Sequence, residues 1–256
     1  MMQWDDEAVV LSVRPHGETS AVVQLLTQSH GRHAGLVRGA QSARARGVYQ
    51  PGNQVRAVWT GRLAEHLGRF ECELLHPYAA QAMDDPDRLV GLVAATAVCE
   101  GAMPEREPHP GCYQGLLVLL DSLSDDHWAE IYVRWELGLL ASLGFGLDLT
   151  RCAGGGDNDQ LSYVSPRSGR AVSLSAGAPF KEKLLPLPRF LLGRGEGGIE
   201  EVADGLALTG YFLERHIFHP RDKALPAARR RLAELFPMAP PDAGGDGDAS
   251  ALKGGP

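Results

Sequence analysis

Residues 31–69 read GRHAGLVRGAQSARARGVYQPGNQVRAVWTGRLAEHLGR and carry seven arginines, one acid (Glu65) and no lysine. The whole chain has 256 residues and a formal net charge of -7, so this stretch is cationic within an acidic protein. Arg32–Arg38 reads as a strand, and Val55–Thr60 alternates apolar and polar residues with the period of a half-buried strand. A cationic, strand-forming stretch of this kind indicates a surface that binds a polyanion.

The segments on either side of this stretch also read as short strands. Ala8–Val13 and Thr19–Thr27 are apolar and β-branched, and Gly68–Leu74 alternates with period two. Turn residues separate these strands, and Gly39–Gly47 reads as a flexible polar loop. Five strands in the first 80 residues predict a small closed barrel, because closure removes exposed strand edges.

The hydrophobic period becomes helical after Asp84. Pro86 suits the first turn of a helix, with Asp85 as its cap. Residues 151–178 are glycine-rich and read as an irregular insert, and residues 237–256 have the composition of a disordered tail. We therefore expect an α+β protein with a five-stranded barrel in residues 1–80 and an all-helical domain in residues 81–236. Helices are expected at Arg88–Met103, Cys112–Leu123, Trp128–Leu143, Glu200–Phe218 and Pro226–Phe236.

Composition narrows the class of protein further. No stretch approaches the roughly 20 apolar residues of a membrane helix, and the N-terminus does not resemble a signal peptide. The four cysteines are scattered without a CxxC pair, which favours a reducing cytoplasm. Gly154–Gly156 precedes acidic residues and is no phosphate-binding loop, and no catalytic constellation stands out. We expect a cytoplasmic protein that is not an enzyme.

Several segments resemble the RecO family of bacterial recombination mediator proteins, over nearly all of residues 5–236. The resemblance implies an N-terminal OB-fold and a helical domain. It also implies binding of single- and double-stranded DNA, annealing, and recombinase loading together with RecR and single-stranded DNA-binding protein (SSB), in association with the nucleoid. The segments that carry it are RPHGETS (Arg14–Ser20), GRHAGLVRGAQSARAR (Gly31–Arg46), QPGNQV (Gln50–Val55), GRLAEHLG (Gly61–Gly68), RWELGLLASLGFGLDLTRCA (Arg134–Ala153) and YVSPRSGRAVS (Tyr163–Ser173).

OB-folds bind single strands with a cationic groove and aromatic platforms. Tyr49 lies in a loop and is expected to be exposed, whereas Trp59 fits the core as well as a stacking platform. His16, His30 and His33 lie in or beside turns without ligand spacing and read as ordinary surface residues. The candidate DNA-binding residues are Arg14, Arg32, Arg38, Arg44, Arg46, Tyr49, Arg56 and Trp59.

The helical domain resembles the family's protein-docking part, which implies binding of the acidic, hydrophobic C-terminal tail of SSB. Arg134 beside Trp135 is the candidate site, because residues 81–150 hold only three cations and have a net charge of -9. A salt bridge between Arg134 and a neighbouring glutamate is an equally open alternative. The basic helix at Ala227–Phe236 is the next candidate for the tail.

Some RecO-like proteins carry a four-cysteine zinc site after the central helix, but this chain keeps only Cys152 there. Gly155 stands where a CxxC partner would be, and Val172-Ser173 where the second pair would be. Since zinc needs three or four ligands, we expect a degenerate zinc-finger-like loop with no metal and no cofactor. The alternative function is an RNA-binding or translation-linked OB-fold protein, because the fold serves both nucleic acids.

Overall fold

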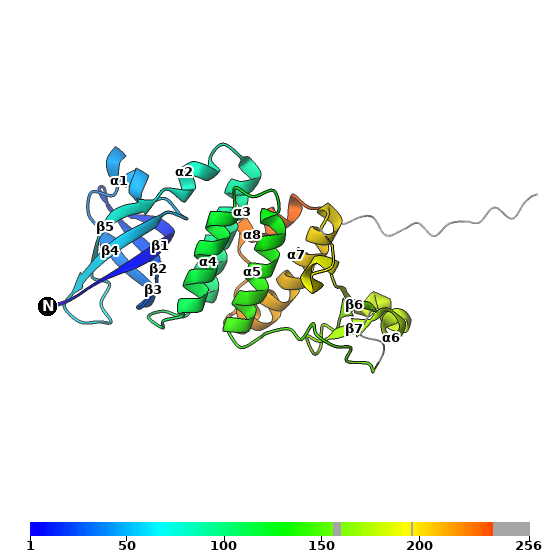
Figure 1. Cartoon of the computed structure of the whole chain (residues 1–256). Coiled ribbons are helices and arrows are strands. Elements are labelled where there is room, and N and C mark those ends of the chain that lie inside the picture. The colour runs from blue at the N-terminus through cyan, green and yellow to red at the C-terminus, as the bar shows by residue number, and fades with distance from the viewer. Residues whose placement is uncertain (156–159, 196, 238–256) are drawn as a thin grey trace, which may run out of the picture.

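The computed structural model describes residues 1–155, 160–195 and 197–237. A barrel, a layer of helices and a small sheet follow one another from one end of the molecule to the other (Figure 1). The barrel is closed, with strand order β1-β2-β3-β5-β4, and the fold class is the expected α+β. Its elements are β1 (Met2–His16), β2 (Ser20–Thr27), β3 (Gly31–Val37), α1 (Ala43–Val48), β4 (Gln54–Gly61) and β5 (Arg69–His76).

Strand β1 is much longer than the segment Ala8–Val13 expected from the sequence. It runs for 15 residues, and its first half pairs with β4 while its second half pairs with β2. The register shifts between Val10 and Ser12, and a bulge of this kind bends a strand. The acidic residues before Ala8 hid this strand, because pairing with β4, rather than local propensity, holds them extended.

The expectation of a flexible loop at Gly39–Gly47 is wrong. Helix α1 begins within it, and the Ser42 hydroxyl caps the helix by accepting a hydrogen bond from the Ala45 N–H at 3.3 Å. Serine is a favoured N-cap, and alanine and arginine are good helix formers. The segment is therefore an ordered part of the barrel surface.

The helical layer follows the expected pattern closely. The Asp85 carboxylate caps α3 by accepting from the Asp87 and Arg88 N–H groups, as the Asp85–Pro86 pattern predicts. None of the helices in the described residues is long and apolar enough to cross a bilayer. The helices are α2 (Tyr78–Ala82), α3 (Pro86–Ala102), α4 (Pro110–Ser122), α5 (Trp128–Ser142), α7 (Ile199–Leu213), a π-helical turn (Glu214–Phe218), a 3-10 turn (His219–Arg221) and α8 (Ala227–Glu234).

Two hydrophobic cores hold the molecule together. One fills the barrel around Trp59 and Phe70. The other runs through the helical layer and includes Val9, Leu11 and Leu26 from the outside of the barrel. Because barrel residues belong to the helical core, the barrel and the helices are packed as one body rather than linked by a free hinge.

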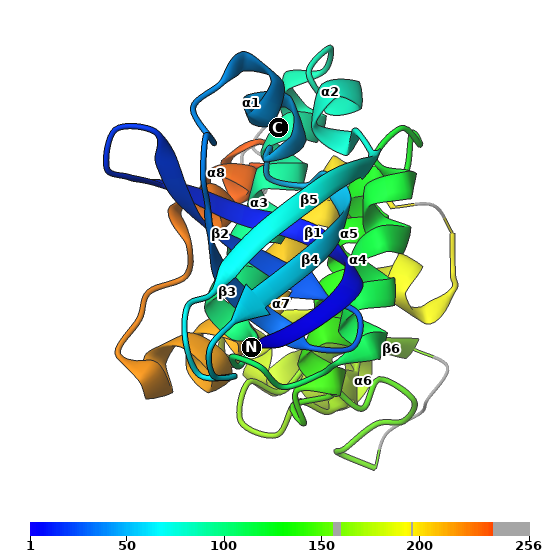
Figure 2. The same cartoon turned by 90° about the vertical axis from the view of Figure 1, so that its left-hand side faces the viewer.

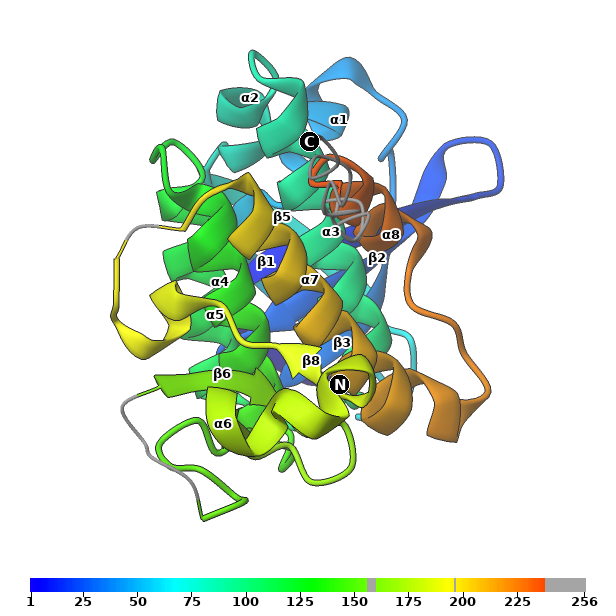
Figure 3. The same cartoon turned by 90° about the vertical axis from the view of Figure 1, so that its right-hand side faces the viewer.

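The expectation of an irregular insert at residues 151–178 is also wrong. The segment contains a hairpin and a short helix, and a third strand completes a sheet of order β7-β6-β8. Figure 3 shows this small sheet below α5 and α7. The predicted tail lies, from residue 238 onward, outside the described residues. The elements are β6 (Leu161–Val164), β7 (Ala171–Ser173), α6 (Leu174–Gly177), 3-10 helix η2 (Ala178–Lys183), β8 (Leu185–Pro186) and 3-10 helix η3 (Arg189–Leu192).

Candidate nucleic-acid interface and protein-docking groove

Three of the predicted DNA-binding arginines gather at one end of the barrel. Arg38 follows β3 directly, and Arg44 and Arg46 lie on α1; all three side chains are exposed. None of the three forms an ion pair with a carboxylate of the described residues, and Arg46 Nε donates only to the Gln41 carbonyl at 3.0 Å. Figure 2 looks onto the side of the barrel and shows α1 at its top, with the β1–β2 hairpin projecting to the left. Three exposed cations without acidic partners form a surface suited to phosphate.

Two further predicted residues are exposed but already paired. Arg14, on the β1–β2 hairpin, lies 2.6 Å from Glu100, and Arg56, on β4, lies 2.7 Å from Asp5. The Arg56 guanidinium lowers the pKa of the Asp5 carboxyl through a hydrogen bond and its charge. A phosphate must therefore displace a carboxylate to reach either arginine, so both are weaker candidates than the α1 end.

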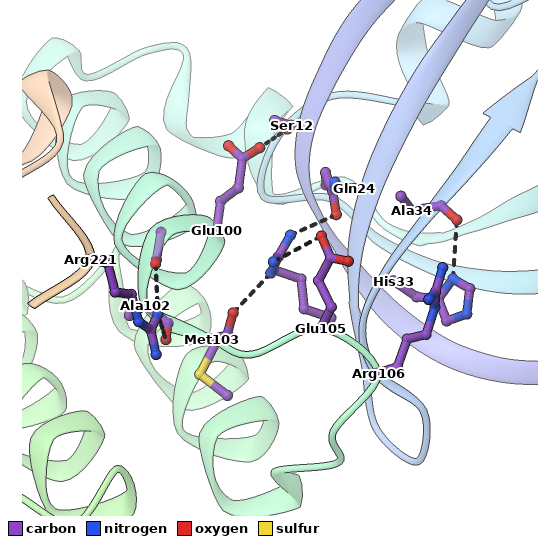
Figure 4. Close-up of polar contacts among 12 residues, drawn as sticks. Ser12, Gln24, His33, Ala34, Glu100, Ala102, Met103, Glu105, Arg106 and Arg221 are labelled. Atoms are coloured by element: carbon purple, nitrogen blue, oxygen red, sulfur yellow. Dashed lines mark hydrogen bonds and ion pairs between the residues drawn. The ribbon is translucent and has the colours of Figure 1, made fainter. Parts of the chain in front are cut away.

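Arg32 does not point to solvent, although it was predicted to contact DNA. Its side chain is 14% exposed and joins the barrel to the segment after α3. Figure 4 labels its partners, Gln24 of the barrel and Met103 and Glu105 after α3. Nε donates to the Met103 carbonyl at 2.9 Å, Nη1 to Gln24 at 3.2 Å and Nη2 to Glu105 at 3.1 Å. This prediction is corrected, because packing of the helical domain on β3 covers the side chain.

The segment between α3 and α4 crosses the base of the barrel as a strap, residues 103–109. The Arg106 N–H donates to the Arg32 carbonyl at 2.9 Å, and Arg106 Nη2 donates to the Glu65 carbonyl at 2.7 Å. Gly31 has a φ of +70°, and a Cβ placed there would lie 2.2 Å from the Glu107 carbonyl oxygen. The strap thus binds both β3 and the β4–β5 loop, and it needs glycine at position 31.

The two predicted aromatic platforms are not available for stacking. Trp59 is 1% exposed, and its Nε1–H donates to the Leu67 carbonyl at 3.1 Å. Of the two alternatives for Trp59, the structure shows the core. Tyr49 is half-buried, not exposed as expected; its hydroxyl accepts from the Cys72 N–H at 3.2 Å, and burial raises the pKa of Tyr49.

The expectation of surface histidines is wrong for His33. It is 4% exposed and packs edge-on against Trp4 and Trp59, and burial lowers the pKa of its imidazole. His30 stacks on Trp4 with ring centroids 4.1 Å apart, and its Nδ1 lies 2.8 Å from Asp6. His16 is exposed, as expected.

A hollow of about 380 Å³ at the β4–β5 loop holds two more arginines of the cationic stretch. Arg62 and Arg69 are exposed at its rim, and Leu36 and Leu67 line it. Leu36 pairs with Arg69 two residues before Arg38, but the β4–β5 loop lies at the far end of β4 from α1, so the hollow is separate from the surface of Arg44 and Arg46. Both arginines belong to residues 31–69 but are not among the candidate DNA-binding residues predicted from the sequence. Their positions beside Gly61 and Gly68, at the two ends of a loop, were the signal that could have indicated their exposure.

The SSB-tail candidates lie on a groove between α4 and α5. The groove has a volume of about 410 Å³, and its apolar wall includes Val118, Ile131 and Trp135. Arg134 stands at the groove, where its Nη2 donates to the Phe190 carbonyl at 2.6 Å and its guanidinium lies 5.4 Å from the centre of the Phe190 ring. The described residues contain no carboxylate in an ion pair with Arg134, so the salt-bridge alternative is not the one observed.

A buried ion pair fixes α5 on the side away from this groove. Glu136 and Arg229 are 0% and 1% exposed, and they form two parallel hydrogen bonds of 2.6 and 2.8 Å. Thr209 donates to the same carboxylate at 2.5 Å, and Arg229 also donates to the Leu206 carbonyl at 2.8 Å. Arg229 is therefore a structural residue, and the basic helix predicted as a second tail site is left with Arg230 and Arg231.

The segment that was expected to resemble a degenerate zinc finger is held by hydrogen bonds around its one cysteine. Cys152 Sγ accepts from the Ser173 N–H at 3.2 Å and from the Gly154 N–H at 3.4 Å. In the part of the chain that the structure describes, no three His, Cys, Asp or Glu side chains are grouped closely enough to hold a metal. Asp157 and Asp159, the acidic residues that follow Cys152 in the sequence, lie outside it. The absence of zinc stays a prediction.

Comparison with known proteins identifies the chain. The model described as Recombination protein O N terminal matches residues 1–78, and the model described as Recombination protein O C terminal matches residues 83–226. A DNA repair protein RecO of Rhodospirillum centenum is 57% identical over 240 residues, covering 93% of this chain and 96% of the relative. Proteins of the same name from Rhodospirillum rubrum (49%, covering 91% of this chain and 96% of the relative) and Phenylobacterium zucineum (50%, covering 93% and 99%) are also similar.

The structure is that of a two-part protein: an N-terminal barrel exposes cations, and the helical part that follows it has an apolar groove. The two family models match both parts of the chain. The chain belongs to the RecO family, and its role is that of a recombination mediator in DNA repair.

Proposed function

We propose that the protein binds single- and double-stranded DNA through the cationic end of its barrel and promotes annealing there without catalysing a reaction. The observation that carries this proposal is the exposure of Arg38, Arg44 and Arg46, which form no ion pair with the described carboxylates although the chain has a net charge of -7. Phosphate contacts supply most of the affinity of sequence-independent DNA binding. The site of action is the cytoplasm, in association with the nucleoid.

The α4–α5 groove is the proposed site for the C-terminal tail of SSB. An acidic, hydrophobic tail needs an apolar wall and one cation, and Trp135 and Arg134 provide them in a region of net charge -9. Docking on SSB brings the barrel to SSB-coated DNA, where the protein loads recombinase together with RecR. No specific contact in the structure favours the RNA-binding alternative, so RNA enters the test as a competitor.

The DNA-binding proposal is tested with labelled single-stranded DNA over a salt series. Arg44→Ala with Arg46→Ala removes two phosphate contacts, and the slope of log K against log salt should fall by about 0.7 to 0.9 for each contact. Arg215→Ala, an exposed cation in the helical layer, is the control and should leave the slope unchanged. An unchanged slope in the double variant, or displacement of DNA by RNA of the same sequence at much lower concentration, would contradict the proposal.

Tail binding is tested by fluorescence anisotropy with an SSB-tail peptide. Arg134→Ala should weaken peptide binding by about 5-fold, because a rim charge pair contributes about 1 kcal/mol, and more if desolvated. DNA binding by the same variant should be retained, since the groove lies outside the barrel. Equal loss of both activities would indicate misfolding, and unchanged peptide binding would move the site to Arg230 and Arg231.

A further inference from the structure

Residues 151–195 are a second cationic part of the chain besides residues 31–69, and they lie at the opposite end of the molecule from the barrel (Figure 1). They hold seven basic and three acidic residues, a formal charge of +4, so the rest of the chain carries -11. The net charge of residues 151–256 as a whole does not show this excess of basic residues, because the acidic residues beyond position 195 offset it. The exposed side chains of Arg151, Arg167, Phe180, Lys181 and Lys183 are called the finger surface below.

The small sheet brings two of these cations to one edge. Val164 pairs with Ala171 in β7 and with Leu185 in β8, so the β6–β7 turn and the approach to β8 lie at the same end of β6. Arg167 is in that turn, and Lys183 precedes Leu185 by two residues. The fold, rather than a single run of basic residues, therefore brings these two cations to the same edge of the sheet.

These cations are available to a ligand. Arg151, Arg167, Lys181 and Lys183 have no ion pair with a carboxylate of the described residues, whereas neighbouring Arg170 and Arg189 are held by Asp148 at 3.6 Å and Glu201 at 2.7 Å. Unpaired cations that stay exposed repel one another, and a polyanion relieves that repulsion.

An exposed aromatic ring directly precedes one of these cations in the chain. Phe180 is 58% exposed and directly precedes Lys181 in η2. A single exposed apolar residue is ordinary by itself. Next to an exposed cation, however, a ring in water offers the kind of stacking platform that single-stranded nucleic acid uses. An acidic peptide tail would instead need an apolar groove such as that between α4 and α5.

We propose that the finger surface binds the backbone and an unpaired base of a second nucleic-acid strand while the barrel holds the first. This inference rests on the proposed DNA binding by the barrel and goes beyond it. Because the helical layer separates the two surfaces, neither strand blocks the other (Figure 1). One molecule with two strands raises their effective concentration, which is what annealing requires.

The test is a two-strand capture assay with the full-length chain. One oligonucleotide is immobilised, the protein is added, and capture of a labelled, non-complementary strand is measured over a salt series. Arg167→Ala with Lys183→Ala should leave binding of a single strand in place but weaken capture of the second. Counterion release predicts about a 5-fold loss per phosphate contact at 0.1 M salt, hence about 25-fold, with a slope lower by about 1.4. Phe180→Leu should weaken capture without changing the slope.

The control is Arg215→Ala with Lys223→Ala, which removes two exposed cations from the helical layer and should leave capture unchanged. Arg167→Lys with Lys183→Arg keeps both charges and should retain capture if the sheet folds normally. Wild-type protein that binds no strand at all would refute the proposed function. Normal capture of the second strand by Arg167→Ala with Lys183→Ala would overturn this inference but not the proposed function. If the same variant also lost binding of purified SSB or RecR, the finger surface would be a protein-binding surface instead.

Discussion

Removal of the buried Arg229 side chain should destabilise the helical layer more than any surface change on the same helix. In Arg229→Leu, Glu136 keeps its burial but loses both parallel hydrogen bonds, and the Leu206 carbonyl loses one. Burial opposes the charge of Arg229, yet the charge of Glu136 and its hydrogen bonds outweigh that effect and raise the pKa of Arg229, so Arg229 stays charged. Arg229→Leu therefore leaves the Glu136 carboxylate buried without its cationic partner.

The expected loss is about 3–5 kcal/mol, the range for breaking a buried pair by removing one partner. For a chain of this size that corresponds to a decrease in melting temperature of about 6–20 °C. Arg230→Leu, on the exposed side of the same helix, should change stability by no more than about 0.5 kcal/mol. Thermal unfolding followed by circular dichroism measures both, and hydrogen exchange locates the loss in α5, α7 and α8.

The double variant Glu136→Leu with Arg229→Leu separates the two parts of this effect. It removes the stranded charge, so it should be far more stable than Arg229→Leu alone, close to wild type. If Arg229→Leu matches Arg230→Leu, or if the double variant is as unstable as the single one, an uncompensated carboxylate is not the cause and the argument fails.

Three further predictions concern the barrel and the small sheet. Gly31→Ala should cost at least about 1–2 kcal/mol, because alanine disfavours a φ of +70° and its Cβ would strike the Glu107 carbonyl; equal denaturation midpoints would refute this. The lowered pKa of His33 means that the unfolded chain binds the proton first as pH falls below about 6.5, so stability should decline there, and His33→Gln should flatten that decline in urea titrations. Metal analysis of the purified, untagged protein should find far less than one zinc per chain, and stoichiometric zinc that disappears in Cys152→Ser would show the opposite.

Much of the fold follows from local patterns in the sequence. Alternation at Val55–Thr60 predicted a strand that the structure has as Gln54–Gly61, and the cap at Asp85 marked the start of α3. Such signals can be recognised in a sequence because they depend only on neighbouring residues and on the side-chain periods of strands (2.0 residues) and helices (3.6 residues). The segments missed were β1 before Ala8, whose partner β4 lies far away in the chain, the short helix α1, and the small sheet, whose strands are only two to four residues long.

Whether an individual side chain is buried, paired or exposed was decided only by the tertiary structure. The sequence by itself determined that residues 31–69 are cationic and lie in a barrel, and that the helical domain has few cations. Yet Arg32 joins two domains, Arg229 is buried against Glu136, and Arg44 is exposed. Sequence neighbours cannot distinguish these arginines, because the cost of desolvating a charge depends on the acid or carbonyl that packing places opposite it. The same holds for Trp59, whose ring lies in the core because the chain closes the barrel around it.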